Sequence, residues 1–138
     1  MKILVDAEFV MNYITGNDED YADSSEAIME MCADEKIDGY ISFHSLSSIL
    51  YILRRYSDFS RRHLIRRICT LFKVVCIKNE AIRMGAYDTD FDDFDDKLNY
   101  ICAQSINADY IVTVNTKDYE HSKVKAVTPI ELVQIVNA

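Results

Sequence analysis

A chain of 138 residues with 49% hydrophobic residues can bury a core of its own, and we expect one domain over residues 1–138. No run of 18 apolar residues occurs, and the early charges at the N-terminus argue against a secretory signal peptide, so no membrane span is predicted. The net charge of −8 argues against a generic basic protein that binds nucleic acid.

The first part of the chain predicts a strand, two helices and a second strand. Residues 2–6 form a short apolar run, typical of a buried parallel strand with Asp6 at its carboxyl end. Apolar residues at helical spacing follow, and Gly16–Asp18 breaks that helix. A second helix over 20–35 and a strand over 39–42 complete this part.

The middle of the chain is mainly helical. Apolar residues at relative positions 0, 3, 4 and 7 predict an amphipathic helix over 44–56. The helix, strand and helix that we expect next cover residues 64–72, 74–77 and 79–86. Tyr13, Tyr51 and Tyr100 lie on apolar helix patterns, so we predict that they belong to the core and not to a surface that stacks on bases.

An acidic segment precedes the next helix, with six aspartates in the nine residues 88–96. Asp93 is predicted as the N-cap, which places Asp95 and Asp96 in the first turn, where the helix dipole favours carboxylates. One interpretation is a capped and solvated turn. The other is that Asp96 points inward and holds a divalent cation together with acids from elsewhere in the chain.

The C-terminal part continues the alternation of strands and helices. We expect strands over 109–114 and 126–127, and Thr128, Pro129 and Glu131 predict a capping box at the start of the last helix. The alternation predicts a three-layer α/β/α sandwich around a mostly parallel sheet of four to five strands.

The predicted topology brings distant acids to one edge of the sheet. Asp6 ends the first strand, Asp96 starts the helix before the fourth strand, and Asn115 and Asp118 follow that strand. Ligands of such sheets bind beyond the carboxyl ends of the strands. We therefore predict that Asp6, Asp96 and Asp118 share one site and can hold a divalent metal ion.

Six arginines give the acidic chain one basic stretch, opposed within residues 54–67 by a single acid, Asp58. The six are Arg54, Arg55, Arg61, Arg62, Arg66 and Arg67. This stretch is either a solvated helix surface that pairs with the chain's own acids, or a surface that contacts RNA phosphates or a protein partner.

The cysteines and histidines show no spacing typical of metal ligands. The cysteines lie in apolar patterns without C-x-x-C pairs, and we predict that they are reduced core residues of a cytoplasmic protein. These cysteines are Cys32, Cys69, Cys76 and Cys102. His44 follows the second strand and is either a hydrogen-bonded loop residue or a residue that faces the site.

Four segments in consistent order resemble the PIN domain family, and specifically its VapC-like toxin ribonucleases, from Met1 to about Val133. Residues 1–6 are similar to the opening strand and first acid of the family, and residues 40–54 to the second strand and its following helix. Residues 93–103 are similar to the segment that bears the third acid, here Asp96, and residues 108–119 to the fourth-strand signature with Thr113, Asn115 and Asp118.

The resemblance implies a hydrolase of phosphodiester bonds that cleaves single-stranded RNA with Mg²⁺ or Mn²⁺. It implies a bacterial toxin with an antitoxin protein as partner, and it leaves a homodimer as an open question. Asp6, Asp96 and Asp118 would be the catalytic metal ligands, and Thr113 or Asn115 would orient an acid or a water. Clustered carboxylates suit this chemistry, because a bound metal ion lowers the pKa of water and stabilises the phosphate.

The chain departs from the family pattern at four positions. Ser48 replaces the usual glutamate in the helix after the second strand and cannot supply its charge. Glu8 replaces a frequent asparagine and is either a compensating metal ligand or a solvated first-turn glutamate, while Asn12 and Val114 replace a frequent aspartate and a frequent basic residue. Two alternatives to a nuclease therefore remain: a binding or regulatory protein that keeps the fold, and a phosphotransfer domain with Asp6 as nucleophile.

Overall fold

The computed structural model describes residues 1–17 and 19–138. Its centre is a five-stranded sheet in the order β3-β2-β1-β4-β5, in which all neighbouring strands run parallel. The strands are β1 (Lys2–Val5), β2 (Asp38–Ser42), β3 (Lys73–Val75), β4 (Tyr110–Val112) and β5 (Lys125–Val127). The predicted α/β sandwich is confirmed, and its sheet is wholly parallel.

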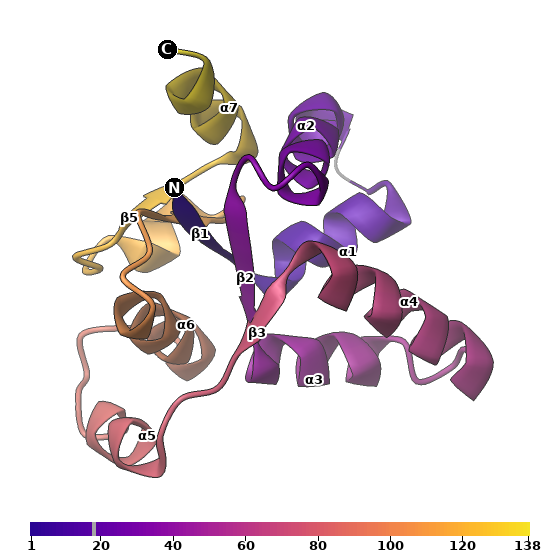
Figure 1. Ribbon diagram of the computed structural model, residues 1–138. Helices are drawn as coiled ribbons and strands as arrows, with labels where there is room; N and C mark the ends of the chain where they lie inside the picture. The colour runs from indigo at the N-terminus through magenta and orange to yellow at the C-terminus, as the bar shows by residue number, and fades with distance from the viewer. Residues whose placement is uncertain (18) are drawn as a thin grey trace.

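Helices cover both faces of this sheet (Figure 1). The α-helices are α1 (Ala7–Thr15), α2 (Ala22–Ala33), α3 (Phe43–Ile52), α4 (Asp58–Leu71), α5 (Asn79–Gly85), α6 (Phe94–Ser105) and α7 (Pro129–Asn137). Two short 3-10 helices are η1 (Glu19–Tyr21) and η2 (Thr116–Tyr119). Figure 1 shows α1, α2 and α4 on one side of the sheet and α5 and α6 on the other. None of the helices in the described residues is long and apolar enough to cross a membrane.

The central strand β1 contributes to two cores. Ile3 and Val5 pack into a core built mainly with α1, α2, α3, α4 and α7, whereas Leu4 packs into a second core with α6. Successive side chains of a strand point to opposite faces, so a strand covered on both faces needs a continuous apolar run. The carboxyl end of β1 therefore lies at the middle of the sheet edge, directly before Asp6.

Side-chain caps set where several helices begin. Asp6 caps α1, and the predicted caps at Asp93 on α6 and Thr128 on α7 are confirmed, the latter as a capping box. Gly16 follows α1 with a φ of 67°, the left-handed conformation that favours glycine. The predicted break at Gly16–Asp18 is thus found at Gly16, and Asp18 lies outside the described residues.

Helix α3 ends earlier than the helix predicted over 44–56. It ends at Ile52, and the separate helix α4 begins after Ser57, which accepts a hydrogen bond from the Ser60 backbone N–H at 3.1 Å. The prediction that Tyr51 belongs to the core is wrong, because it lies in the last turn of α3 and is 66% exposed. Of the other two predicted core tyrosines, Tyr100 is buried and Tyr13 is partly buried.

The prediction of four core cysteines is wrong for two of them. Cys32 and Cys102 are buried, whereas Cys69 and Cys76 are exposed, and all four thiols are free. Cys76 follows β3, which is an edge strand with a neighbour on one side only, so its apolar sequence context does not lead to burial.

Candidate functional site

Asp6 lies at the centre of the sheet edge and is held from two sides. Its Oδ1 accepts a hydrogen bond from the Phe9 backbone N–H at 2.8 Å, which caps α1. The Thr113 hydroxyl, at the end of β4, donates to the same carboxyl group. Both Asp6 and Thr113 are buried, so the side chain is fixed beneath the surface of the site.

Asp96 and Asp118 are carried by α6 and η2, close enough to Asp6 for their charges to act on it or on each other. The Asp93 cap accepts from the Asp96 backbone N–H at 3.2 Å and so places Asp96 in the first turn of α6, half-buried. Asp118 is exposed and lies in η2, directly after β4. Asp96 and Asp118 line a cleft of about 350 Å³, together with the basic residues Lys117 and His121.

The charges of these acids act on one another. Burial raises the pKa of Asp6 to about 6, and repulsion from Glu8 and Asp118 adds to this, against hydrogen bonds from Thr113 and Phe9. Burial likewise raises the pKa of Asp96 to about 6, helped by the charges of Asp93, Asp118 and Asp6. The structure thus brings Asp6, Asp96 and Asp118 within electrostatic range of one another.

The three acids do not form a closed metal cage. Within residues 1–17 and 19–138, no group of three or more His, Cys, Asp and Glu side chains is arranged to hold a metal ion. Magnesium sites commonly use one or two carboxylates and leave the other positions to water and substrate phosphate. The donor set therefore fits a weakly held, open hard-cation site better than a structural one.

The predicted supporting residues lie around the acids. Thr113 Oγ1 accepts from the Asn115 backbone N–H at 3.1 Å, and Asn115 Nδ2 donates to Glu8 Oε2 at 2.6 Å. Glu8 is exposed, but this hydrogen bond ties it to the loop that carries Asp118. Ser48 instead donates to the His44 carbonyl at 3.1 Å within α3.

A buried polar chain next to Asp96 was not predicted. The Tyr119 hydroxyl donates to Asp96 Oδ1 at 3.2 Å and accepts from Asn99 Nδ2 at 3.1 Å. Asn99 Oδ1 in turn accepts from the Ser42 hydroxyl at 2.9 Å. The signal available in the sequence was a polar residue, Asn99, one turn after Asp96 in an otherwise apolar helix face.

Lys97 neutralises part of the charge of the acidic segment by pairing with two of its aspartates. It is only 6% exposed, and its Nζ lies 3.0 Å from Asp90 Oδ1 and 3.3 Å from Asp88 Oδ2. Burial would lower the pKa of Lys97, but the hydrogen bonds that its ammonium donates to Asp90 and Asp88 outweigh burial, and the pKa is raised. Its ammonium also lies over the rings of Phe91 and Tyr100. Asp88 and Asp90 therefore belong to an ion-paired loop rather than a freely solvated turn, and Asp96 alone of the six contacts the buried Tyr119 chain.

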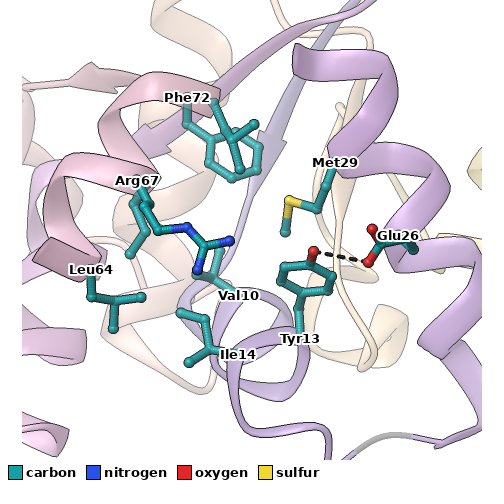
Figure 2. Close-up of a pocket in the computed structure, with 10 residues that line it drawn as sticks. Val10, Tyr13, Ile14, Glu26, Met29, Leu64, Arg67 and Phe72 are labelled. Atoms are coloured by element: carbon teal, nitrogen blue, oxygen red, sulfur yellow. Dashed lines mark hydrogen bonds between the residues drawn. The ribbon is translucent and has the colours of Figure 1, made fainter. Parts of the chain in front are cut away.

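The six arginines do not act as one group in the described residues. Arg61 and Arg62 pair with Asp58, at 3.7 and 2.7 Å, and Arg54 stacks over the Tyr51 ring at 4.2 Å. Arg55, Arg62 and Arg66 are exposed on the α3–α4 turn and on α4. Arg67 lines a separate pocket, shown in Figure 2.

That pocket lies between α1, α2 and α4 and has a volume of about 310 Å³. Figure 2 shows the Arg67 side chain reaching over apolar walls that include Val10 and Phe72. On its other side the Tyr13 hydroxyl donates to Glu26 Oε2 at 2.9 Å. None of the three aspartates lines this α1/α2/α4 pocket, so it is distinct from the acid site.

Removing the charge of Asp6 should stabilise the metal-free protein at alkaline pH. Its folded-state pKa of about 6 lies above the ordinary value of 3.8, so stability is lost as the pH rises from about 4 through 6. Asp6→Asn keeps an oxygen that accepts from Phe9, so the cap survives. We expect the melting temperature at pH 7.5 to rise by about 5 °C, with almost no gain at pH 4.

Thermal denaturation in the presence of a chelator measures this effect at both pH values. Asp92→Asn, which removes an exposed carboxylate of the acidic segment, serves as the control and should change little. If Asp6→Asn lowered the melting temperature equally at both pH values, the hydrogen bonds of the carboxyl group would matter more than its charge.

The profile of a protein family described as PIN domain matches residues 2–117. The fold is similar to a chain in the crystal structure of VapBC2 from Rickettsia felis bound to a DNA fragment from their promoter, with a TM-score of 0.72. That match covers 93% of this chain and 98% of the other at 14% sequence identity, so it concerns the fold alone. No curated protein matches the sequence.

Proposed function

This chain belongs to the PIN domain family, and on that premise we propose that it is a metal-dependent endoribonuclease of the toxin–antitoxin type that cleaves single-stranded RNA. The observation that supports the proposal is that burial, together with repulsion between carboxylates that include Asp118, raises the pKa of Asp6 and Asp96 to about 6. Such a cluster is stabilised by a cation, and a phosphodiester brings its own negative charge to that cation.

The donor set fits Mg²⁺ or Mn²⁺. The three carboxylates would hold the ion together with water and phosphate oxygens, with Glu8 as an additional carboxylate held near the site by Asn115. When bound, such an ion lowers the pKa of water and stabilises negative charge on phosphate.

The chain's own residues prepare the site. The hydrogen bond from the Thr113 hydroxyl orients the Asp6 carboxyl, and Asn115 holds Glu8. The cleft beside Asp96 and Asp118 is open to solvent and carries Lys117 and His121 on its walls, where a cationic side chain can bind a phosphate. The reacting group would therefore enter through this cleft, beside Asp96 and Asp118.

A cleavage assay with a single-stranded RNA in Mn²⁺ tests the proposal against its alternatives. Metal-dependent products support a nuclease. RNA binding without cleavage would support a regulator that keeps the fold, which the loss of the family's glutamate at Ser48 favours. Beryllofluoride trapped on Asp6 would support a phosphotransfer domain, in which Lys117 would face the phosphoryl group.

The exposed arginines of α4 are proposed to contact RNA. Arg62 and Arg66 lie one turn apart on the same face of α4, and the Arg62–Asp58 ion pair is exposed enough to yield to a phosphate. Changing both to Ala should flatten the dependence of log binding constant on log salt by about 1.4, at about 0.7 per lost contact. Filter binding at several salt concentrations measures this slope.

The matched control removes two exposed lysines at the far edge of the sheet, Lys123 and Lys125, and so changes the net charge equally. If the arginines contact RNA directly, only the arginine variant should show a shallower dependence of RNA binding on salt concentration. Equal losses would indicate a general charge effect, and unchanged RNA affinity in the arginine variant would assign this surface to a protein partner.

An antitoxin protein is proposed as the partner of this chain. The apolar α1/α2/α4 pocket with Arg67 at its side suits an apolar segment that carries an acidic residue. A neighbouring gene for a small DNA-binding protein, and a stable complex between the two purified proteins, would support this pairing.

A further inference from the structure

Three buried side chains form a continuous hydrogen-bonded chain that ends on the half-buried Asp96. Ser42, Asn99 and Tyr119 are between 0% and 4% exposed, so water does not compete for their polar groups. The chain links the end of β2 to α6 and then to η2, three elements that meet only in the folded protein. Its contacts are 2.9, 3.1 and 3.2 Å long.

Each donor in this hydrogen-bonded chain points to the next residue along it, in the direction of Asp96. Ser42 Oγ lies 2.7 Å from Ser45 Oγ and 2.9 Å from Asn99 Oδ1, and Ser45 Oγ lies 3.4 Å from the same Asn99 oxygen, so hydroxyl donors surround Asn99 Oδ1. Because Asn99 Oδ1 accepts, its amide N–H₂ faces the Tyr119 oxygen. The Tyr119 oxygen receives that N–H, and its own proton is therefore directed to the Asp96 carboxylate. Hydrogen bonds aligned in this way polarise and strengthen one another.

The ring of Tyr119 is itself held in place. It packs edge-on against Phe91 at a centroid distance of 6.3 Å, and Phe91 stacks on Tyr100 at 5.3 Å. The hydroxyl uses only one of the two oxygens of Asp96, so the other can bind a cation without loss of this hydrogen bond. Asp96 is half-buried in a first helical turn, and the Tyr119 hydroxyl holds one of its carboxylate oxygens.

We propose that Tyr119 and Asn99 are positioning residues that fix the Asp96 carboxylate for metal binding and RNA cleavage, through a chain of hydrogen bonds that begins at Ser42. This inference rests on the proposed function, because it assigns these hydrogen-bonded residues a role at the same acid site. Partners of this kind orient ligand side chains, and their loss commonly reduces metal affinity or activity by about 10- to 100-fold.

Tyr119→Phe tests the inference, because it removes the hydroxyl and keeps the ring that packs on Phe91. We expect the Mn²⁺ affinity measured by isothermal titration calorimetry to fall by about 10-fold or more. In RNA cleavage at fixed Mn²⁺, kcat should fall while KM for RNA stays within about twofold, since phosphate contacts elsewhere are intact. A purely structural role would lower the melting temperature without this division between kcat and KM.

Tyr100→Phe is the matched control. It removes a hydroxyl from a buried tyrosine in the same aromatic cluster, but that hydroxyl accepts from Gln104 Nε2 at 2.9 Å. Its Mn²⁺ affinity and kcat should stay within about twofold of the wild type. Equal losses in the two variants, or no loss in Tyr119→Phe, would overturn the inference.

Asn99→Asp provides a second, isosteric variant. A carboxylate at this position would accept the Tyr119 proton, so Asp96 would lose its donor as it does in Tyr119→Phe. The losses in Mn²⁺ affinity should be similar, and the double variant should be no worse than either single one. Additive losses would contradict a single chain. A wild-type protein that neither binds Mn²⁺ nor cleaves RNA would instead reject the proposed function together with this role.

Discussion

Replacing Asp96 with Asn should reduce Mn²⁺-dependent RNA cleavage by about two to three orders of magnitude, the loss that follows removal of a major electrostatic contribution. Asp96 lines the cleft and is repelled by Asp118 and Asp6, so it is the acid that links the open cleft to the buried Asp6. The same change should cancel most of the rise in melting temperature that Mn²⁺ gives the wild type, because the ion binds only the folded site.

The asparagine at this position can still accept the hydrogen bond from Tyr119, so the variant isolates the charge. Asp95→Asn is a suitable control, since Asp95 lies in the same first turn but is exposed. Cleavage and thermal shift should be close to those of the wild type in the control. A fully active Asp96→Asn variant would mean that cleavage occurs at another site.

Ser48→Glu should increase Mn²⁺ affinity by about 10-fold, because one more carboxylate adds one negative charge to a three-acid site. Ser48 lies one turn after Ser45 on α3, and Ser45 Oγ lies 3.4 Å from Asn99 Oδ1 beside the acid site. Helical side chains lean toward the N-terminus of their helix, and α3 begins at the same sheet edge as the acids. The loss of the Ser48–His44 hydrogen bond should cost little.

The melting temperature of Ser48→Glu should also change in opposite directions with and without metal. In a chelator its melting temperature should fall, because a fourth carboxylate increases repulsion, and in Mn²⁺ it should rise above that of the wild type. Ser47→Glu adds the same charge to an exposed position of α3 and should do neither. Identical behaviour of the two variants would mean that position 48 does not reach the site.

The apolar patterns of the sequence predicted the order of strands and helices most clearly where a strand is buried on both faces, as β1 is. In β1 the run Ile3–Val5 has no polar residue to disturb it, and both of its faces are covered by helices. The helix N-caps could also be predicted from the sequence, since Asp93 and Thr128 accept hydrogen bonds from backbone groups within three residues. The prediction that the three aspartates share a site came from topology, because a parallel sheet places all carboxyl ends of its strands at one edge. The charges of the three aspartates act on one another, but within the described residues they form no closed group of metal ligands.

What could not be predicted depends on contacts between distant residues. Asn99 and Tyr119 are polar residues in unremarkable local sequence, and only the fold places the Asn99 amide 3.1 Å from the Tyr119 hydroxyl. Lys97 follows Asp96 directly and gives no local sign that its ammonium is buried between Asp88, Asp90 and two rings. The loop geometry that decides such pairings is not encoded in periodicity.

The most direct test of the acid site is cleavage of a single-stranded RNA by the purified wild type, in Mn²⁺ and in chelator, beside Asp6→Asn. Asp6 is buried, and a contaminating nuclease would cleave equally in preparations of the wild type and of Asp6→Asn, so the variant is a stringent reference. We predict weak cleavage by the wild type that requires Mn²⁺ and is absent in Asp6→Asn. Cleavage that persists in chelator, or that is equal in Asp6→Asn, would contradict a carboxylate-bound metal nuclease at this site.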